Sequence, residues 1–283
     1  MSIFNGVALV TGAASGIGRQ TALSFIREGC LRLVLVDRDA DKLKDTEKTI
    51  NDMSKNQDIQ VIAIPTDISK EKDIDNLYHT TIEKFGRVDY VVNGAGVLSN
   101  NKRSHESTIE EFDLINNVNY RGCWLSSRAA IRQMLKQEPL PTHDGRPGSR
   151  GSIVNIASQL GVVGRPAART SEDPVLINLQ PLTFGEPIAA YCGSKAAVIN
   201  MTRCDAIDYS KDLIRVNAVC PGVIDTAMTR PQADVLAPAV NIAPMGRMGT
   251  AQEVADCVLF LASSKASFVQ GSAMMVDGGY VIN

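Results

Sequence analysis

Short apolar runs alternate with amphipathic helical segments along the whole chain, and this alternation limits the possible folds more than any other feature. The first run, at residues 7–10, is rich in β-branched residues, and apolar residues then recur at helical spacing until Gly29. Parallel neighbouring strands need a crossover connection, which is usually a helix. The pattern therefore predicts an α/β fold with a doubly wound parallel sheet of about seven strands and helices on both faces. The strands are expected at residues 7–10, 31–36, 59–65, 88–93, 152–157, 214–219 and 273–276.

The alternation continues through all 283 residues, which favours a single domain over two small ones. Two insertions interrupt it, at residues 138–150, rich in Pro and Gly, and at residues 165–187. The insertion at residues 138–150 leads into the amino end of the predicted fifth strand. Doubly wound parallel sheets bind ligands at the opposite edge, where the strands have their carboxyl ends. We therefore expect residues 138–150 to form a solvated loop that tolerates shortening.

Charge and composition argue against several classes of partner. Lys and Arg number 29 against 31 Asp and Glu, a formal charge of -2 without blocks of one sign, so neither nucleic acid nor acidic lipid is an expected partner. The six cysteines are scattered without a CxxC pair, which indicates reduced thiols and no metal site. No signal-peptide pattern and no run of about 18 apolar residues occurs, so a cytoplasmic location away from membranes is expected.

The turn after the first strand is rich in glycine and reads Thr11-Gly12-Ala13-Ala14-Ser15-Gly16-Ile17-Gly18. Glycines allow a tight bend and close approach of the backbone to phosphate, and the following helix would offer free N–H groups to a diphosphate. A tight turn alone could also explain any one of these glycines. The strand–turn–helix context predicts a dinucleotide site, with contacts at Gly12, Ser15, Gly16, Ile17 and Gly18.

Two acids follow the next strands. Asp37 comes after the apolar run 33–36, about 20 residues beyond the glycines, where a carboxylate can accept hydrogen bonds from an adenosine ribose. It would repel a 2′-phosphate and so favours NAD, although Arg38 could offset the repulsion and leaves NADP possible. Asp67 is placed to reach the adenine edge. An ordinary helix N-cap is the alternative for both acids.

Tyr191 and Lys195 lie four residues apart in a helical stretch and should project from one face. A phenol with a pKa near ~10 is a poor base at neutral pH, but an ammonium and an oxidised nicotinamide both favour the phenolate. Tyr191 is therefore expected to exchange a proton with an alcohol or ketone while a hydride moves to or from the nicotinamide.

Two further polar residues are candidates for the same site. Ser158 follows the fifth strand at the ligand-binding edge, where its hydroxyl could hold the substrate oxygen. Asn119 lies within a long helical stretch, where its short polar side chain favours a local distortion that could hold a water linked to Lys195. Either residue taken alone is more often structural, so the prediction depends on the four residues acting together.

These motifs, in this order, resemble the short-chain dehydrogenase/reductase family over nearly the whole chain. The resemblance is carried by the glycine turn, Asn93-Gly94-Ala95-Gly96, the tetrad of Asn119, Ser158, Tyr191 and Lys195, and the turn Pro221-Gly222-Val223-Ile224-Asp225-Thr226. It implies a Rossmann fold, a nicotinamide cofactor whose ribose hydroxyls Lys195 and Tyr191 bind, and a homotetramer built on helices near 109–136 and 189–211. It also implies cofactor contacts at Ile68, Asn93, Ala95, Gly96, Val118, Pro221, Gly222, Ile224 and Thr226.

The chain departs from the family pattern in two places. Gly94 stands where the family usually has a second asparagine, which should loosen a local hydrogen bond. The 32 residues between Ser158 and Tyr191 exceed the family's usual dozen by about 20. Since both ends of this surplus are tied to candidate catalytic residues, we expect a substrate-facing loop, with folding over a subunit face as the alternative.

The family's lid segment follows Thr226 and is largely apolar here, with few cations that could meet an anionic substrate. This composition suits a bulky lipophilic small molecule such as a terpenoid, steroid or polyketide-derived ring of secondary metabolism. The sequence thus predicts an NAD-dependent enzyme that interconverts a secondary alcohol and a ketone. An NADPH-dependent ketoreductase of a polyketide or carrier-bound β-keto group is the alternative. A non-catalytic dinucleotide sensor or scaffold is the alternative from another class.

Overall fold

The computed structural model describes residues 3–54, 58–98, 104–164 and 189–282, with some side chains near residues 232–235 excepted. The predicted insertion at 165–187 therefore lies outside the described residues. None of the described helices is both long enough and apolar enough to cross a membrane.

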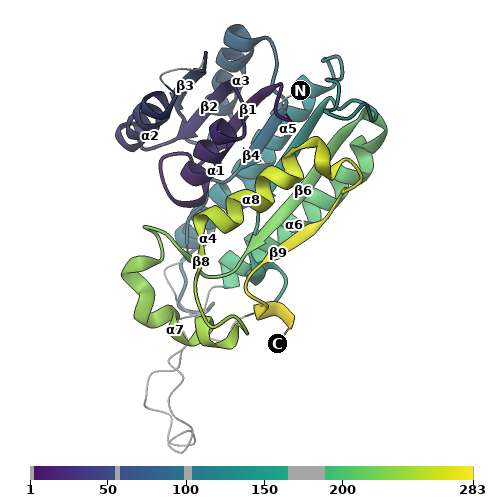
Figure 1. Ribbon diagram of the computed structural model, residues 1–283. Coiled ribbons are helices and arrows are strands. Elements are labelled where there is room, and N and C mark those ends of the chain that lie inside the picture. Colours follow the sequence, from purple (N-terminus) through teal and green to yellow (C-terminus); the bar gives the residue numbers. More distant parts are fainter. Residues whose placement is uncertain (1–2, 55–57, 99–103, 165–188, 283) are drawn as a thin grey trace, which may run out of the picture.

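A parallel seven-stranded sheet in the order β3-β2-β1-β4-β5-β6-β9 runs through the centre of the molecule (Figure 1). This confirms the predicted doubly wound α/β fold in a single domain, with strand ends that differ from the sequence prediction by one or two residues. The strands are β1 (Val7–Thr11), β2 (Arg32–Asp37), β3 (Gln60–Pro65), β4 (Tyr90–Asn93), β5 (Gly151–Ile156), β6 (Ile214–Pro221) and β9 (Ala273–Val276). A separate pair joins β7 (Ile224–Asp225) to β8 (Gly249–Thr250).

Helices cover both faces of the sheet because successive strand residues point to opposite sides. In β1, Ala8 and Val10 pack under α1 (Gly16–Arg27), α2 (Ala40–Met53) and α8 (Ala251–Ala262). Val7 and Leu9 pack on the other face, against α3 (Glu71–Phe85), α5 (Cys123–Met134) and α6 (Ala189–Tyr209). The central strands are buried on both faces and therefore read as continuous apolar runs in the sequence.

The long helix expected near residues 109–136 is not uniform. It consists of α4 (Ile109–Asn116), a π-helical segment η1 (Asn117–Gly122) and α5. The distortion predicted around Asn119 is present as this π-helix, which widens the turn by one residue and commonly marks a functional site.

Residues 138–150 connect α5 to the amino end of β5, as predicted, but they are not simply a solvated loop. Thr142 is buried, and His143 Nδ1 lies 2.6 Å from the Ser264 hydroxyl. Arg146 donates to the Ser267 hydroxyl at 2.5 Å, and the Asn5 amide donates to the Pro141 carbonyl at 3.2 Å. Removing these anchored residues would leave hydrogen-bonding groups of two other segments, at Asn5 and at Ser264–Ser267, without their partners, so we expect shortening to be tolerated only at other positions of the loop.

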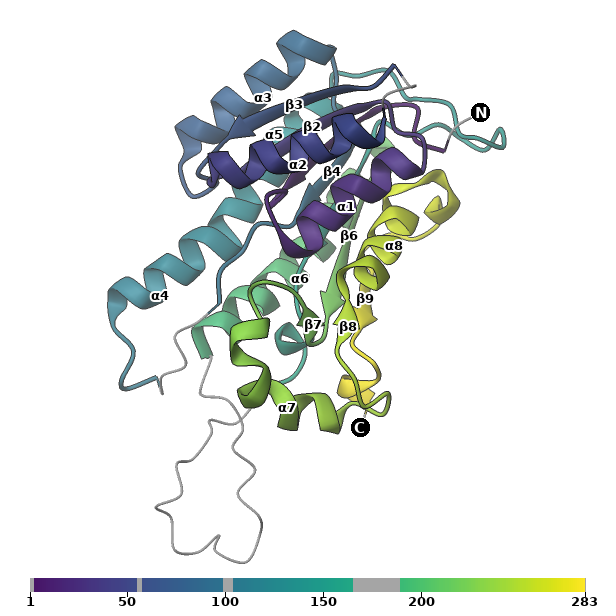
Figure 2. The ribbon, with the colours of Figure 1, turned by 60° about the vertical axis from the view of Figure 1, so that its left-hand side comes forward.

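At the carboxyl edge of the sheet, β1 lies between β2 and β4, so the connections after β1 and β4 diverge at this point. Such a switch point opens a crevice outside the strand ends. Helix α7 (Ala233–Ile242) and the carboxyl-terminal segment lie beyond this edge, close to one another in both views (Figures 1 and 2).

Candidate active site

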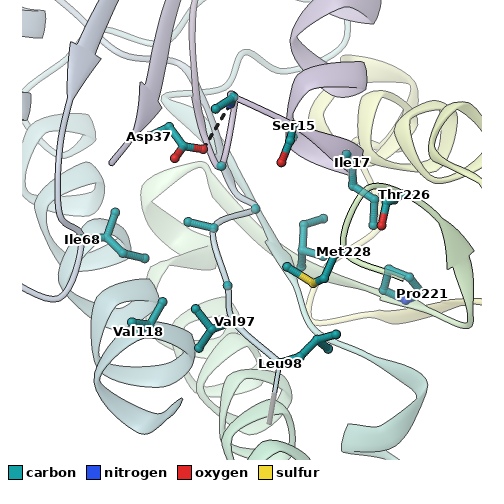
Figure 3. A pocket seen from close by; sticks show the side chains of 18 of the residues that line it. Ser15, Ile17, Asp37, Ile68, Val97, Leu98, Val118, Pro221, Thr226 and Met228 are labelled. Carbon is teal, nitrogen blue, oxygen red and sulfur yellow. Dashed lines mark hydrogen bonds between the residues drawn. The ribbon is translucent and has the colours of Figure 1, made fainter. Parts of the chain in front are cut away.

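A cavity of about 380 Å³ occupies this crevice and extends from the end of β2 to α6 (Figure 3). Every sequence-predicted cofactor contact lines it except Asn93, and three of the four predicted catalytic residues do so as well. These lining residues are Gly12, Ser15, Gly16, Ile17, Gly18, Asp37, Arg38, Asp67, Ile68, Ala95, Gly96, Val118, Ser158, Tyr191, Lys195, Pro221, Gly222, Ile224 and Thr226. The predicted cofactor end and the predicted catalytic end therefore form one continuous space.

The glycine turn brings the backbone close to this space. Gly12 has φ of 75° and Gly16 φ of 53°, conformations that favour glycine. A Cβ atom at Gly18 would lie 2.2 Å from the Gly12 carbonyl oxygen, so no larger residue fits where α1 packs against the turn. The glycines thus provide the tight bend that the sequence predicts, together with close packing of α1 on the turn.

The amino end of α1 is left without a side-chain cap. Its N-cap residue, Ser15, makes no capping hydrogen bond, whereas Thr108 and Thr250 form full capping boxes on α4 and α8. The first N–H groups of α1 therefore remain free to bind an anion that lies in the cavity. A dinucleotide diphosphate fits this donor set.

Asp37, the last residue of β2, holds the glycine turn as well as facing the cavity (Figure 3). Its carboxylate accepts a hydrogen bond from the Ala14 backbone N–H and another from the Asp39 N–H, both at 3.1 Å. It is not a helix cap, because Asp39 caps α2 by accepting from the Lys42 N–H. An anion held at this point can bind the two hydroxyls of a ribose and would repel a phosphate.

Asp67 also lines the cavity, and the alternative of a helix N-cap does not hold because the N-cap of α3 is Lys70. Its carboxylate accepts hydrogen bonds from the Ser69 N–H at 3.1 Å and from the Ser69 hydroxyl at 2.7 Å. It therefore closes a turn next to Ile68, which also lines the cavity.

Tyr191 and Lys195 lie one turn apart on α6, as their spacing predicts. The Lys195 ammonium lies 5.8 Å from the centroid of the Tyr191 ring and donates to the Ile156 carbonyl at 2.8 Å. Ser158 follows β5, and its hydroxyl is hydrogen-bonded to the Tyr191 phenol. Three side chains from two elements thus meet at one point of the cavity.

The side chains around Tyr191 do not by themselves lower the pKa of its phenol, contrary to the expectation from the sequence. Burial raises the pKa of Tyr191 to about 12, and the hydrogen bond with Ser158 opposes this only in part. Burial also lowers the pKa of Lys195 to about 8. The sequence predicts that two positive charges favour the phenolate form of Tyr191: the Lys195 ammonium and the ring of an oxidised nicotinamide. The ring's charge must therefore contribute strongly if Tyr191 is to become a base.

Asn119 does not line the cavity, and its side chain is fully engaged. The amide donates to the Val97 carbonyl at 3.0 Å and accepts from the Val97 N–H at 2.8 Å. It also donates to the Ser194 hydroxyl at 3.3 Å. Gly96 lies between Asn119 and Lys195, since a Cβ there would be 3.2 Å from the Asn119 Oδ1 and 3.6 Å from the Lys195 Nζ. The structure therefore places Asn119 behind the reacting groups, where it ties η1 to the loop after β4.

Asn93, predicted to line the cofactor groove, is the last residue of β4, and its side chain packs against α5 instead of lining the cavity. Its side chain is buried and donates to the Ser127 hydroxyl at 3.0 Å and to the Asn155 Oδ1 at 2.8 Å. Sequence reasoning also missed Thr11, whose Oγ1 accepts from the Gly94 and Ala95 N–H groups at 3.0 and 3.1 Å. Thr11 thus links the turn after β1 to the turn after β4. The signal in the sequence was a hydroxyl residue at the end of a strand that is expected to pair with β4.

The described residues hold no cluster of three or more His, Cys, Asp and Glu side chains that could bind a metal ion. The functional groups that line the cavity comprise the uncapped amino end of α1, the Asp37 carboxylate, and a phenol hydrogen-bonded to Ser158 with the Lys195 ammonium 5.8 Å from its ring centroid. This set can hold a dinucleotide and place an alcohol or ketone oxygen beside a proton donor.

Comparison with known proteins agrees with this arrangement. Residues 6–170 match the family model described as short chain dehydrogenase, and residues 181–281 match one described as enoyl-(acyl carrier protein) reductase. Among curated relatives, a 2-(R)-hydroxypropyl-CoM dehydrogenase of Xanthobacter autotrophicus is 34% identical, covering 97% of this chain and 98% of its own. A 3-oxoacyl-[acyl-carrier-protein] reductase of Thermotoga maritima is 33% identical, covering 98% of each chain.

Solved structures of two proteins named as reductases also align with nearly the whole chain. Levodione reductase superposes with a TM-score of 0.82 at 28% identity, covering 99% of this chain and 98% of its own. A 3-ketoacyl-(acyl-carrier-protein) reductase from Brucella melitensis, complexed with NADH, has a TM-score of 0.80 at 30% identity and covers 99% and 100%. The alternative of a non-catalytic sensor finds no support, because these relatives are named dehydrogenases and reductases. The chain belongs to the short-chain dehydrogenase/reductase family, whose members use NAD or NADP, and is an oxidoreductase acting on CH–OH groups.

Proposed function

We propose that the protein interconverts a secondary alcohol and a ketone on a bulky lipophilic molecule, with NAD(H) as its cofactor. The observation that carries this proposal is the single cavity that joins the Asp37 carboxylate to the Ser158–Tyr191–Lys195 cluster. The nicotinamide, when bound, takes up or gives the hydride.

Each residue of the cluster has a distinct task in this proposal. The Tyr191 phenolate takes the alcohol proton during oxidation, and the phenol returns that proton to the ketone oxygen during reduction. The Ser158 hydroxyl holds the same substrate oxygen, and the Lys195 ammonium stabilises the phenolate and binds ribose hydroxyls. Asn119 acts as a positioning residue, since its amide is occupied by Val97 and Ser194.

Replacing Tyr191 by Phe tests the acid/base role directly. The ring and its packing remain, while the proton donor is lost, so kcat for a panel of secondary alcohols should fall by roughly 10²- to 10⁴-fold. Dinucleotide binding, followed by nicotinamide fluorescence, should change by less than about tenfold. Turnover at the wild-type rate in Tyr191→Phe would refute the mechanism. Tyr120→Phe, at an exposed tyrosine on η1, is the matched control.

The choice of NAD rests on Asp37. Loss of a hydrogen bond to a charged group costs about 1.5–3 kcal/mol, so Asp37→Asn should weaken NADH binding by roughly 10- to 100-fold and improve NADPH binding. Titration of both nucleotides into wild type and variant measures the two effects. Tighter binding of NADPH than of NADH by the wild type would contradict the proposal.

One observation favours the second candidate, an NADPH-dependent reductase of a carrier-bound β-keto group. Arg38 and Lys42 line the cavity beside Asp37 and could pair with a 2′-phosphate. Lys42, however, already pairs with Asp39 at 2.7 Å. The relative from Thermotoga maritima is named for this activity. Wild-type preference for NADPH in the same titration would move this candidate to first place.

The lipophilic substrate class is supported by apolar side chains that line the cavity. Val97, Leu98 and Met228 are among them (Figure 3), and Met228 is half exposed. Apolar walls with few polar groups bind ligands of matching character. Cyclic secondary alcohols should therefore have higher kcat/KM than hydroxy acids of equal size, and a preference for the acids would contradict this class.

We also propose the homotetramer that the family resemblance implies. Ile109, Phe112, Leu114, Trp124 and Ile207 are exposed on α4, α5 and α6, which is unusual for large apolar side chains. Trp124→Glu should shift the mass measured by light scattering towards smaller species. A monomeric wild type would refute the proposal.

A further inference from the structure

A second cavity, of about 310 Å³, lies on the other side of the loop that follows β6. Helix α7 forms one wall, and the carboxyl-terminal segment after β9 forms another, in the region where these two elements approach one another in Figures 1 and 2. The cavity shares only Gly222 and Ile224 with the active-site cavity. It is therefore a separate space with a common wall.

The walls of this second cavity are mostly apolar, and the charged groups on them are already paired. Asp277 accepts hydrogen bonds from the Gly279 and Val281 N–H groups at 3.0 and 2.9 Å. Arg247 pairs with Glu253 at 2.6 Å. The apolar lining comprises Val223, Ile224, Ala239, Val240, Ala243, Met245, Met275 and Val276.

Gln159 is the exception among these lining residues. Its side chain is only 3% exposed, yet its Oε1 has no hydrogen-bond partner among the described residues. A Cβ at Gly222 would lie 2.9 Å from this oxygen, so the glycine keeps the space beside it open. A buried acceptor without a donor is costly unless a ligand or water supplies one.

We propose that this second cavity binds a small, largely apolar molecule that donates one hydrogen bond, from a hydroxyl or N–H group, to the Gln159 Oε1. The geometry does not depend on the proposed reaction, since neither Ser158 nor Tyr191 lines the cavity. The ligand is either a separate molecule or the remote end of a large substrate, and both sources present the same chemistry to Gln159.

Indole is a suitable probe because it is apolar and carries a single N–H donor. Methionine methyl groups labelled with ¹³C report its position, since Met245 and Met275 line the second cavity and Met228 lines the first. We expect indole to shift the methyl signals of Met245 and Met275 while that of Met228 stays in place. Signals are assigned with single Met→Leu variants.

The hydrogen bond is tested by comparing indole with 1-methylindole, which lacks the donor. Wild type should bind indole roughly 3- to 10-fold more tightly, the size expected for one neutral hydrogen bond. Gln159→Leu should remove this preference while retaining the shifts at Met245 and Met275. Ala243→Leu, which fills the cavity and leaves Gln159 intact, should abolish binding of both probes.

Two results would overturn the proposal. One is the absence of any shift at Met245 and Met275 up to the solubility limit of indole. The other is an equal preference for indole in wild type and in Gln159→Leu. Inhibition kinetics then identify the source of the ligand: indole that raises KM for bulky alcohols alone indicates the remote end of a substrate. Binding without any change in KM indicates a separate molecule.

Discussion

The buried ammonium of Lys195 should make the stability of this protein depend on pH in a way that a single substitution removes. The side chain is only 5% exposed, and burial lowers the pKa of Lys195 from 10.5 to about 8, against a smaller opposing effect of Cys123 and Cys220. In the unfolded chain the same group titrates near its ordinary pKa. Between these two values the unfolded state binds more protons than the folded state, so the free energy of unfolding must rise with pH.

The magnitude follows from the two pKa values. A shift from 10.5 to about 8 is worth about 3 kcal/mol at 1.36 kcal/mol per unit. Below pH ~8 both states are protonated and the full cost of the buried charge is present. From pH ~7 to ~9.5 the free energy of unfolding should gain about 2 kcal/mol from this one group, and the remainder appears above pH ~9.5.

The assay is urea unfolding at fixed protein concentration, across this pH range, for wild type and Lys195→Met. Cysteines and tyrosines also titrate there and are present in both proteins, so the difference between the two curves reports Lys195 together with its coupling to Cys123 and Cys220. Lys44→Met, at an exposed lysine on α2, should run parallel to wild type. A constant difference between wild type and Lys195→Met from pH ~7 to ~9.5 would refute the reasoning.

Three further predictions concern backbone packing and a buried ion pair. Gly18→Ala should weaken NADH binding by more than about 100-fold or prevent folding, because the added Cβ would lie 2.2 Å from the Gly12 carbonyl oxygen. Fluorescence titration measures the binding, and circular dichroism shows whether the variant folds. Gly193→Ala should instead raise the unfolding free energy by about 0.5–1 kcal/mol, because outside its own helix no atom of the described residues lies within 4 Å of the added Cβ. Asp89→Asn should lower the free energy of unfolding in urea by about 2 kcal/mol and leave kcat unchanged. The reason is that the buried Asp89 carboxylate pairs with Arg87 at 2.7 Å and accepts a hydrogen bond from the Val7 N–H at 2.8 Å.

Most of the fold and the cofactor end of the site follow from local features of the sequence. Alternating apolar runs specify buried parallel strands, and the glycine turn specifies the bend after β1, because both depend on residues close together in the chain. Tyr191 and Lys195 were predictable for the same reason, since four-residue spacing on a helix places two side chains on one face. The placement of Ser158 beside them required only that β5 end at the carboxyl edge of the sheet.

Other features depended on contacts between distant segments. The Asn93 side chain is buried away from the cavity because Ser127 and Asn155, far along the chain, supply its hydrogen-bond partners. The pKa of Tyr191 is raised rather than lowered by the protein, because burial is set by the whole packed structure. Residues 138–150 are anchored by Ser264 and Ser267, whose proximity no local pattern signals.

The sequence by itself therefore determined the order of strands and helices, the turn that can hold a diphosphate, and the pairing of Tyr191 with Lys195. Only the tertiary structure decided that Asn119 is occupied by Val97 and Ser194, and that the Gln159 Oε1 lies without a partner in a second cavity. The physical reason is the range of the interactions. Periodicity and backbone conformation act between neighbours in the chain, whereas burial, hydrogen-bond satisfaction and cavities arise from packing among segments that the sequence keeps far apart.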